Sequence, residues 1–239
     1  MKDKTKLGTR IVEVHNGSSL FTGDAGGGES NLRRFIIEND LLEAIVAMPD
    51  KEFYNTPIAT YIWIVTNRKE LRRKGKVQLI DATSIKSPLL KNLGEKGCEL
   101  SKENRDAILS ILERFEEGYC SRILDNNEFG YWEVELFLPA RDSDGERIKD
   151  KKGKIKLAKV RGEVEQIPLN YPGGIDGFYE TEVKPYNPEI VFGEPKIGYN
   201  LSFSKYFYKP VTLRNIDVIN NELIALRELE TKYLSQIFE

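Results

Sequence analysis

The segment LLEAIVAM, Leu41–Met48, restricts the fold of this chain more than any other part of the sequence. It is a nearly unbroken apolar run of strand length. Apolar residues that do not alternate with polar ones are typical of a strand that is buried on both faces. Such strands belong to α/β proteins, in which helices cover both sides of one sheet. The run therefore predicts an α/β fold with this strand in its interior.

Three further strands and one helix are predicted around this run. Thr9–Val14 is a short β-branched strand, and Glu29–Asp40 has the apolar spacing of a helix with Ser30 as its N-cap. Ile58–Val65 is the next strand. Lys76–Asp81 alternates and follows a basic turn, which predicts a hairpin with the strand before it. This order of elements is that of the second half of an open α/β sheet.

The first half of such a sheet has no counterpart in this sequence. An open α/β fold needs its first βαβ units to cover and complete the sheet. Only a few residues precede the strand Thr9–Val14, so we expect the sequence to start inside a domain. Residues 1–100 are accordingly predicted to be the C-terminal half of a Rossmann-like domain that ends in an antiparallel hairpin.

Residues 101–212 are predicted to form an extension with one amphipathic helix and one clear strand. Ser101 is the expected helix cap, and Phe129–Arg141 alternates like a strand. The charged segment that follows, up to Val164, is interpreted as an insertion or mobile loop. The aromatic-rich segment 189–210 is interpreted as irregular. The apolar stripe of the helix consists of Ala107, Ile108, Ile111, Leu112 and Phe115.

Residues 213–239 are predicted to form a C-terminal helix of the coiled-coil type. Its apolar residues recur at alternating steps of three and four, and Glu230 interrupts this seam. An apolar seam at the end of a chain must be buried against something. The seam residues are Ile216, Ile219, Leu223, Leu226, Tyr233 and Ile237.

Composition and charge exclude several classes of protein. The net charge of −2 argues against a self-sufficient DNA-binding domain, which is usually basic. Two cationic segments, Arg68–Lys76 and Arg147–Arg161, are interpreted as solvated hairpin tips. Cys98 and Cys120 lie in unrelated contexts, so neither a metal site nor a disulfide is predicted, and the cytoplasm is the expected compartment. We expect neither a secretory signal nor a membrane span, because no apolar run reaches the roughly 18 residues that a span needs.

Three short motifs are weak functional candidates. Gly23–Ser30, GDAGGGES, precedes a helix and could cradle a phosphate, but it lacks both phosphate-loop spacings and is interpreted as a flexible loop. His15 is the only histidine, and without a GxSxG elbow it is expected to be structural. Tyr186–Ile190, YNPEI, is superficially similar to an Asn-Pro-Pro-aromatic motif, but Glu189 replaces the second proline.

The strongest functional candidate is the adjacent pair Phe53 and Tyr54. Both aromatics stand among polar and turn-forming residues just before the strand Ile58–Val65. One ring could belong to the core and the other to its rim. Alternatively, the pair forms a stacking surface for a planar ligand such as a base flipped out of a duplex. The second interpretation fits the position, because a loop at a strand mouth is where an α/β sheet binds ligands.

The stretch Asn16–Lys69 resembles the C-terminal part of the modification subunit of type I restriction–modification systems. The most specific parts of this resemblance are LFTGDAGGGES and FYNTPIATY, followed by RKGKVQLIDA. FGYWEVELFLPAR and EVKPYNPEIVFGEPKIGYNLSFSKYFYKP are similar to the extended C-terminal region of the longer members. These subunits are adenine-N6 DNA methyltransferases that use S-adenosylmethionine. The resemblance therefore implies the second half of a methyltransferase-type sheet.

The resemblance also implies where the chemistry lies. The cofactor loop and the Asn-Pro-Pro-aromatic motif of the family would precede Met1, so we expect no catalytic residue, no metal and no bound cofactor in this chain. In related adenine methyltransferases an aromatic on the loop before the antiparallel hairpin stacks on the flipped base. That position corresponds here to Phe53, with Tyr54 beside it and Asn55 and Thr56 flanking it.

The partners that the resemblance implies are DNA, a specificity subunit and a restriction subunit. The specificity subunit would dock on the C-terminal helix, through which this chain could also self-associate. A non-enzymatic scaffold within a restriction complex is the alternative. An upstream reading frame that encodes an Asn-Pro-Pro-aromatic motif would support the enzyme, and a genuine start codon at Met1 would support the scaffold.

Overall fold

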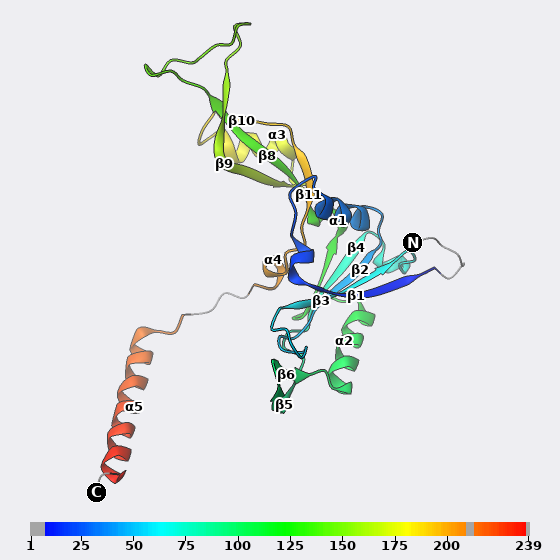
Figure 1. The fold of residues 1–239 in the computed structure, drawn as a ribbon, viewed down its shortest axis with the longest axis vertical. Coiled ribbons are helices and arrows are strands. Elements are labelled where there is room, and N and C mark those ends of the chain that lie inside the picture. The colour runs from blue at the N-terminus through cyan, green and yellow to red at the C-terminus, as the bar shows by residue number, and fades with distance from the viewer. Residues whose placement is uncertain (1–7, 209–212, 238–239) are drawn as a thin grey trace. The chain divides into compact units, whose positions relative to one another are not determined.

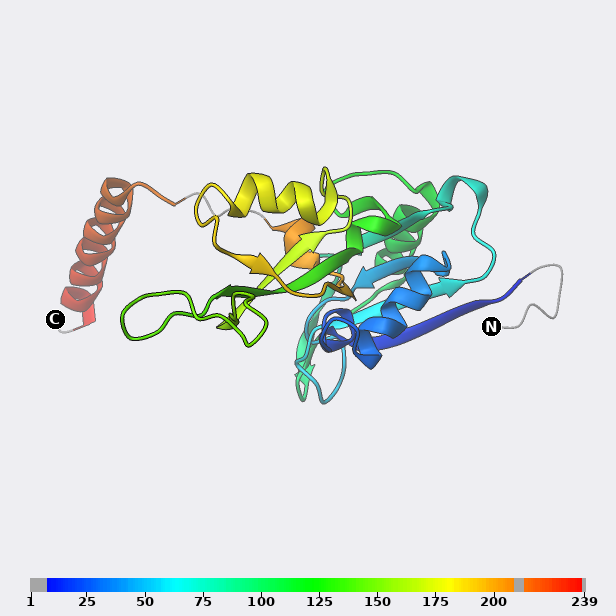
Figure 2. The same ribbon diagram turned by 90° about the horizontal axis from the view of Figure 1, so that it is seen from above.

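The computed structural model describes residues 8–208 and 213–237, and it divides the chain into two units. The first unit, Met1–Phe207, is a mixed α/β structure (Figure 1, Figure 2). The second, Tyr208–Glu239, contains the helix α5, Ile216–Ile237. The predicted C-terminal helix is thus present, although it begins at Ile216 rather than at Leu213.

The main sheet of the first unit has five strands in the order β1-β3-β2-β4-β7. The apolar run of the sequence forms β2, and all six of its residues are buried, as predicted. β3 runs antiparallel to both β1 and β2, β4 runs parallel to β2, and β7 runs antiparallel to β4. The five strands are β1 Arg10–Asn16, β2 Leu42–Ala47, β3 Thr60–Thr66, β4 Lys76–Asp81 and β7 Ser121–Asp125.

The predicted hairpin between β3 and β4 is wrong, because β2 lies between these two strands. A strand that is buried on both faces needs a hydrogen-bonded neighbour on each edge, and β3 and β4 fill these two positions. The connection between β3 and β4 therefore crosses the end of β2. Lys69 Nζ lies 2.5 Å from Asp40 Oδ1, and Arg73 Nε lies 3.7 Å from Glu43 Oε1. Both cations are buried, so the interpretation of this basic segment as a solvated tip is wrong for these two residues, whereas Arg68, Arg72 and Lys74 are exposed.

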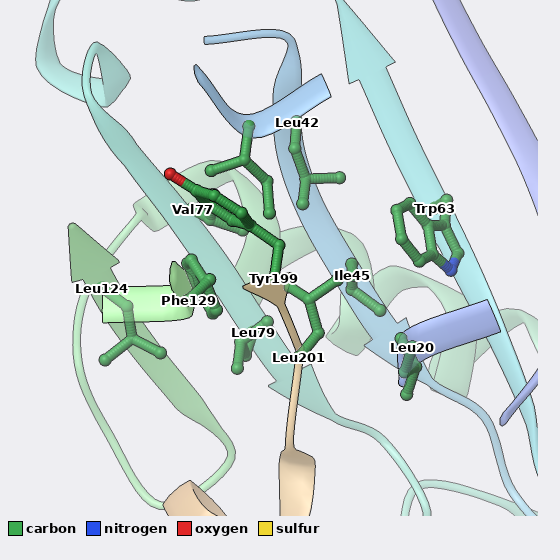
Figure 3. Packing of buried hydrophobic residues seen from close by; sticks show 11 residues of the cluster. Leu20, Leu42, Ile45, Trp63, Val77, Leu79, Leu124, Phe129, Tyr199 and Leu201 are labelled. Carbon is green, nitrogen blue, oxygen red and sulfur yellow. The ribbon is translucent and has the colours of Figure 1, made fainter. Parts of the chain in front are cut away.

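Helices pack on both faces of this sheet. α1, Gly28–Glu38, contributes Ile37 to a core on the face that carries Ile45. Figure 3 shows Ile45 in this core beside Leu42 and Leu79. Successive residues of β2 point to opposite sides of the sheet, so the strand also presents an apolar surface on the other face. α2, Lys102–Arg114, packs on that face. Its residues Ile108, Ile111 and Leu112 contact the second core, which consists of Ala44, Val46, Met48, Ile64, Ile80 and Ala82.

The two predicted helix caps have different outcomes. Ser101 caps α2 as expected: its hydroxyl accepts a hydrogen bond of 3.3 Å from the N–H of Asn104. Ser30 does not cap α1, whose N-cap is Gly27. The Ser30 side chain is instead buried, and its hydroxyl accepts a hydrogen bond of 3.0 Å from the N–H of Tyr199. A long-range contact therefore replaces the local one.

A second sheet is formed by residues that the sequence pattern described poorly. β8, Gly130–Pro139, confirms the predicted strand. β9, Leu157–Pro168, pairs with β8 in two stretches separated by a register shift, so the predicted loop up to Val164 is wrong beyond residue 156. The segment predicted to be irregular also contains regular elements. These are β10 Val191–Phe192, β11 Lys196–Tyr199 and α4 Phe203–Phe207, and they follow α3 Gly174–Phe178 and a π-helical turn Tyr179–Val183.

A small hairpin that the sequence did not predict follows β4. It consists of β5, Ser87–Leu93, and β6, Lys96–Glu99. Its strands are short and mostly exposed, so they carry little hydrophobic periodicity. Among the residues that the structure describes, no helix is long and apolar enough to cross a membrane, and no cluster of His, Cys, Asp and Glu could hold a metal ion.

Candidate functional site

The candidate aromatic pair lies on the loop 48–59, which joins β2 to β3. Phe53 forms an isolated bridge with Thr56, so the chain turns sharply through Tyr54 and Asn55. The exposed fraction is 37% for Phe53 and 59% for Tyr54. Both rings are therefore accessible to a ligand at the tip of this loop.

The ends of this loop are anchored in the sheet. The N–H of Met48 donates a hydrogen bond of 2.9 Å to the carbonyl of Thr60, next to the antiparallel pairing of β2 with β3. Met48 and Thr60 are both buried. Loops that start and end on rigid strands hold functional side chains more precisely than free loops do. The core of the sheet thus sets the position of Phe53.

The β5–β6 hairpin braces the same loop along its backbone. The N–H of Glu95 donates to the carbonyl of Tyr54 at 3.2 Å, and the N–H of Gly97 donates to the carbonyl of Lys51 at 3.0 Å. Lys96 Nζ lies 2.7 Å from the carbonyl oxygen of Glu52 and 3.3 Å from its carboxylate. These contacts fall on both sides of Phe53, so the hairpin restricts the movement of the aromatic turn.

Gly94 allows the hairpin to approach this closely. Its φ is +62°, a conformation that side chains disfavour, and a Cβ there would lie 3.2 Å from the carbonyl oxygen of Tyr54. Any larger residue at this position would strain the turn and press on the backbone of the aromatic pair. The sequence contained no periodic pattern that could indicate this role.

A cavity of about 430 Å³ lies between the loop and the hairpin, but Phe53 and Tyr54 are not among its lining residues. It is lined in part by Cys98, whose thiol donates to the carbonyl of Asp50 at 3.1 Å. Burial, together with the nearby charge of Glu52, raises the pKa of Cys98. The thiol therefore stays protonated near neutral pH and ties β6 to the loop.

The weaker motifs occupy other parts of the first unit. The Gly-rich loop reaches α1 at Gly27, but a Cβ on Gly23 would lie only 2.8 Å from Glu29 Oε2. A carboxylate at this helix start disfavours a phosphate in the same place. His15 Nε2 lies 3.1 Å from Glu13 Oε2 on β1. In YNPEI, the Glu189 carboxylate accepts hydrogen bonds from two arginines of the β8–β9 connection.

A second cavity of about 430 Å³ lies beside β1 and was not predicted from the sequence. It is lined by residues of α1, β1 and β3, among them Arg33 and Trp63. Arg33 is buried and donates to the carbonyl of Tyr199 at 2.6 Å, but its Nη2 and the Nε1 of Trp63 have no partner among the described residues. Within the described chain β1 pairs only with β3, and all seven of its residues are exposed. This side of the sheet is therefore uncovered.

The predicted seam of α5 is exposed wherever its side chains are described. Its residues Ile216, Ile219, Leu223, Leu226 and Tyr233 all leave a large part of their surface accessible. The side chain of Ile237 lies outside the described residues. Other apolar residues of the helix, Val218, Ile224, Leu229 and Leu234, are exposed as well.

Comparison with known proteins assigns the class. The family model described as N-6 DNA Methylase matches residues 2–130, which is more than half of the 239-residue chain. The chain therefore belongs to the N-6 DNA methylase family.

The similar proteins all belong to one kind of enzyme, the type I restriction enzymes. The type I restriction enzyme MjaVIII methylase subunit of Methanocaldococcus jannaschii is 36% identical over 150 residues, which are 61% of this chain and 24% of that protein. The MjaVII methylase subunit of the same organism is 37% identical over 123 residues, which are 50% of this chain and 20% of the relative. The chain thus spans about a quarter or less of the length of these relatives.

A solved structure is also similar. The type I restriction-modification system methyltransferase subunit of Streptococcus thermophilus aligns with a TM-score of 0.42 and 20% identity. The alignment covers 50% of this chain and 24% of that protein.

Proposed function

We propose that this chain is the C-terminal part of a type I modification subunit. The intact subunit would transfer a methyl group from S-adenosylmethionine to adenine N6 in DNA. The observation that carries the proposal is the aromatic turn at Phe53 and Tyr54, which is exposed, anchored in the sheet and braced by a hairpin, within the part of the chain that matches the family.

The role proposed for this turn is to hold the target base outside the duplex. Enzymes that modify a base must first remove it from the stack, which costs a few kcal/mol. An aromatic face recovers part of this cost, since stacking is worth roughly 1–3 kcal/mol per base. Phe53 would supply that face, and Tyr54 would support it. The flanking residues Asn55 and Thr56 keep the turn polar and tight.

The described residues do not fit S-adenosylmethionine, so the cofactor would be held by other parts of the intact subunit. The Gly-rich loop before α1 has the Glu29 carboxylate against Gly23, where it would repel the carboxylate of the cofactor. We therefore assign this chain no step of the methyl transfer. Its contribution would be to bind and orient the base, and the chain alone should be inactive.

The uncovered side of the main sheet supports the same proposal. An unpaired strand edge and an open cavity beside it are expected where another part of the same fold packs. The remainder of the intact subunit would add a strand to β1 and cover the cavity that holds Arg33 and Trp63. The buried donors of these two side chains would then find acceptors.

The exposed seam of α5 supports a docking role. At about 1.5 Å per residue a helix of this length extends roughly 33 Å, and its apolar face needs a partner in water. In the intact complex that partner would be the specificity subunit. The same seam also favours the alternative function, a non-enzymatic scaffold that joins subunits without acting on DNA.

The experiment that tests the base-stacking role uses the intact subunit in complex with its specificity subunit. Phe53→Ala should weaken binding of the flipped base by roughly 1–3 kcal/mol, which is about 5–150-fold in affinity. Phe53→Trp should retain most of the activity, because it keeps an aromatic face. Tyr186→Ala, at an exposed aromatic of the second sheet region, is the matched control. Equal methylation rates for the wild type and Phe53→Ala would exclude the stacking role.

A further inference from the structure

The connection between β8 and β9 is an ordered arm and carries a charge pattern that the base-stacking loop does not use. Residues 140–156, here called the two-turn arm, extend from the second sheet as two loops (Figure 1, Figure 2). The N–H of Ala140 donates to the carbonyl of Lys156, that of Lys156 donates to Ile148, and that of Ile148 donates to Ala140, all at 2.8–2.9 Å. This closed set of backbone bonds joins the two turns at their base.

Each turn is built in the same way. Asp142 Oδ1 accepts hydrogen bonds from two backbone N–H groups of the first turn, at 2.9 and 3.0 Å. Asp150 Oδ1 does the same in the second turn, at 2.8 and 2.9 Å. Gly145 and Gly153 close the turns at φ values of +85° and +79°. The aspartates are thus engaged in shaping the backbone.

The arginines of the arm are also engaged. Arg141 and Arg147 both bind the carboxylate of Glu189, at 2.9 and 2.5 Å. This pairing connects the first turn to the segment before β10. The first turn also carries Asp144 and Glu146, so it has no excess of positive charge.

The second turn, in contrast, has five lysines and a single acidic residue, Asp150. All five lysines are exposed, and none forms an ion pair with another residue that the structure describes. They lie within eight consecutive residues, on a backbone that the hydrogen bonds of the turn fix in advance. The five are Lys149, Lys151, Lys152, Lys154 and Lys156.

We propose that the second turn of this arm binds the phosphate backbone of duplex DNA. This inference rests on the proposed function in one respect, namely that the intact subunit acts on DNA. Lysines are point charges that suit phosphates, and a duplex carries one negative charge per roughly 1.7 Å of its axis. Arg141–Ala158 contains no aromatic residue, whereas protein interfaces are enriched in aromatics and depleted in lysine. Backbone contacts of this kind position a protein on DNA without reading its sequence.

The test measures the salt dependence of DNA binding by the full 239-residue chain. A short fluorescent duplex is titrated by anisotropy at several salt concentrations between about 50 and 200 mM. The double variant Lys151→Gln, Lys152→Gln keeps Asp150 and the turn glycine. Each phosphate contact contributes about −0.9 to the slope of log affinity against log salt. The loss of two contacts should therefore make the slope of the variant less negative by about 2.

The matched control is Lys102→Gln, Lys184→Gln, which removes the same charge from exposed positions outside the arm. It should retain the wild-type slope. Phe53→Ala should also retain the slope, which separates this inference from the base-stacking role. An unchanged slope in the arm variant, or a chain that does not bind the duplex at the lowest salt, would overturn the inference. Tighter binding of labelled polyglutamate than of the duplex through the same lysines would assign the arm to an acidic protein instead.

Discussion

The contact between Lys96 and Glu52 provides the sharpest test of how the aromatic loop is held. Lys96→Met keeps most of the aliphatic stem and removes the ammonium group. The variant therefore loses the hydrogen bond of 2.7 Å to the Glu52 carbonyl and the ion pair of 3.3 Å with its carboxylate. The other backbone bonds between β6 and the loop remain available.

The expected magnitude follows from the burial of this pair. The exposed fraction of the side chain is 23% for Lys96 and 16% for Glu52. A hydrogen bond to a charged group contributes about 1.5–3 kcal/mol, whereas an exposed ion pair contributes about 1 kcal/mol or less. For this partly buried pair we expect about 1–2 kcal/mol. The loss should favour local opening of the loop by roughly 5–30-fold.

Hydrogen exchange of the full chain measures this opening directly. The amides of Glu95 and Gly97, which donate to the loop, should exchange roughly 5–30-fold faster in Lys96→Met. Amides of β2 should be unaffected, because the hairpin lies at the periphery of the sheet. Lys91→Met, at an exposed position of the same hairpin, is the control. If the Gly97 amide exchanges at the wild-type rate, the lysine does not brace the loop.

Three further changes test other parts of the molecule. Gly94→Val should strain the turn at φ +62° and accelerate hydrogen exchange of the Glu95 amide, which donates to the Tyr54 carbonyl. A wild-type exchange rate of this amide would show that the close approach of Gly94 is not required. Asp40 has a lowered pKa, because hydrogen bonds from Lys69, Asn126 and Gly75 outweigh the opposing effect of burial. The Asp40 carboxylate therefore contributes its full stabilisation above its unfolded pKa of about 3.9, and this stabilisation is lost as the pH falls through the lowered folded pKa. The unfolding free energy of the wild type should decrease over this acidic range. Asp40→Asn should lack this pH-dependent decrease. Leu223→Asp combined with Leu226→Asp should leave the melting of the α/β unit unchanged and prevent co-purification of the intact subunit with its specificity subunit; wild-type recovery of the complex would place the interface elsewhere.

Local patterns predicted the elements whose structure depends on local chemistry. The apolar run of β2 predicted a strand that is buried on both faces, and it is. The Ser101 cap predicted the start of α2, and Ile108, Ile111 and Leu112 of the predicted stripe face the core, whereas Ala107 is exposed and Phe115 is the C-cap. The position of Phe53 and Tyr54 on a loop between two strands followed from the same reading, although their role in base stacking stays a prediction.

The amino-acid sequence by itself thus determined only the strongly patterned elements, such as β2, β8, α2 and α5, because periodicity and capping act within one or two turns of the chain. Only the tertiary structure decided which strand edges pair. β4 pairs with β2 rather than β3, and β9 is a strand because β8 offers it an edge. Burial of Lys69 and the bracing of the aromatic loop by Lys96 were decided in the same way. Both depend on partners distant in sequence, and hydrogen bonds and ion pairs between such partners leave no periodic trace in the chain.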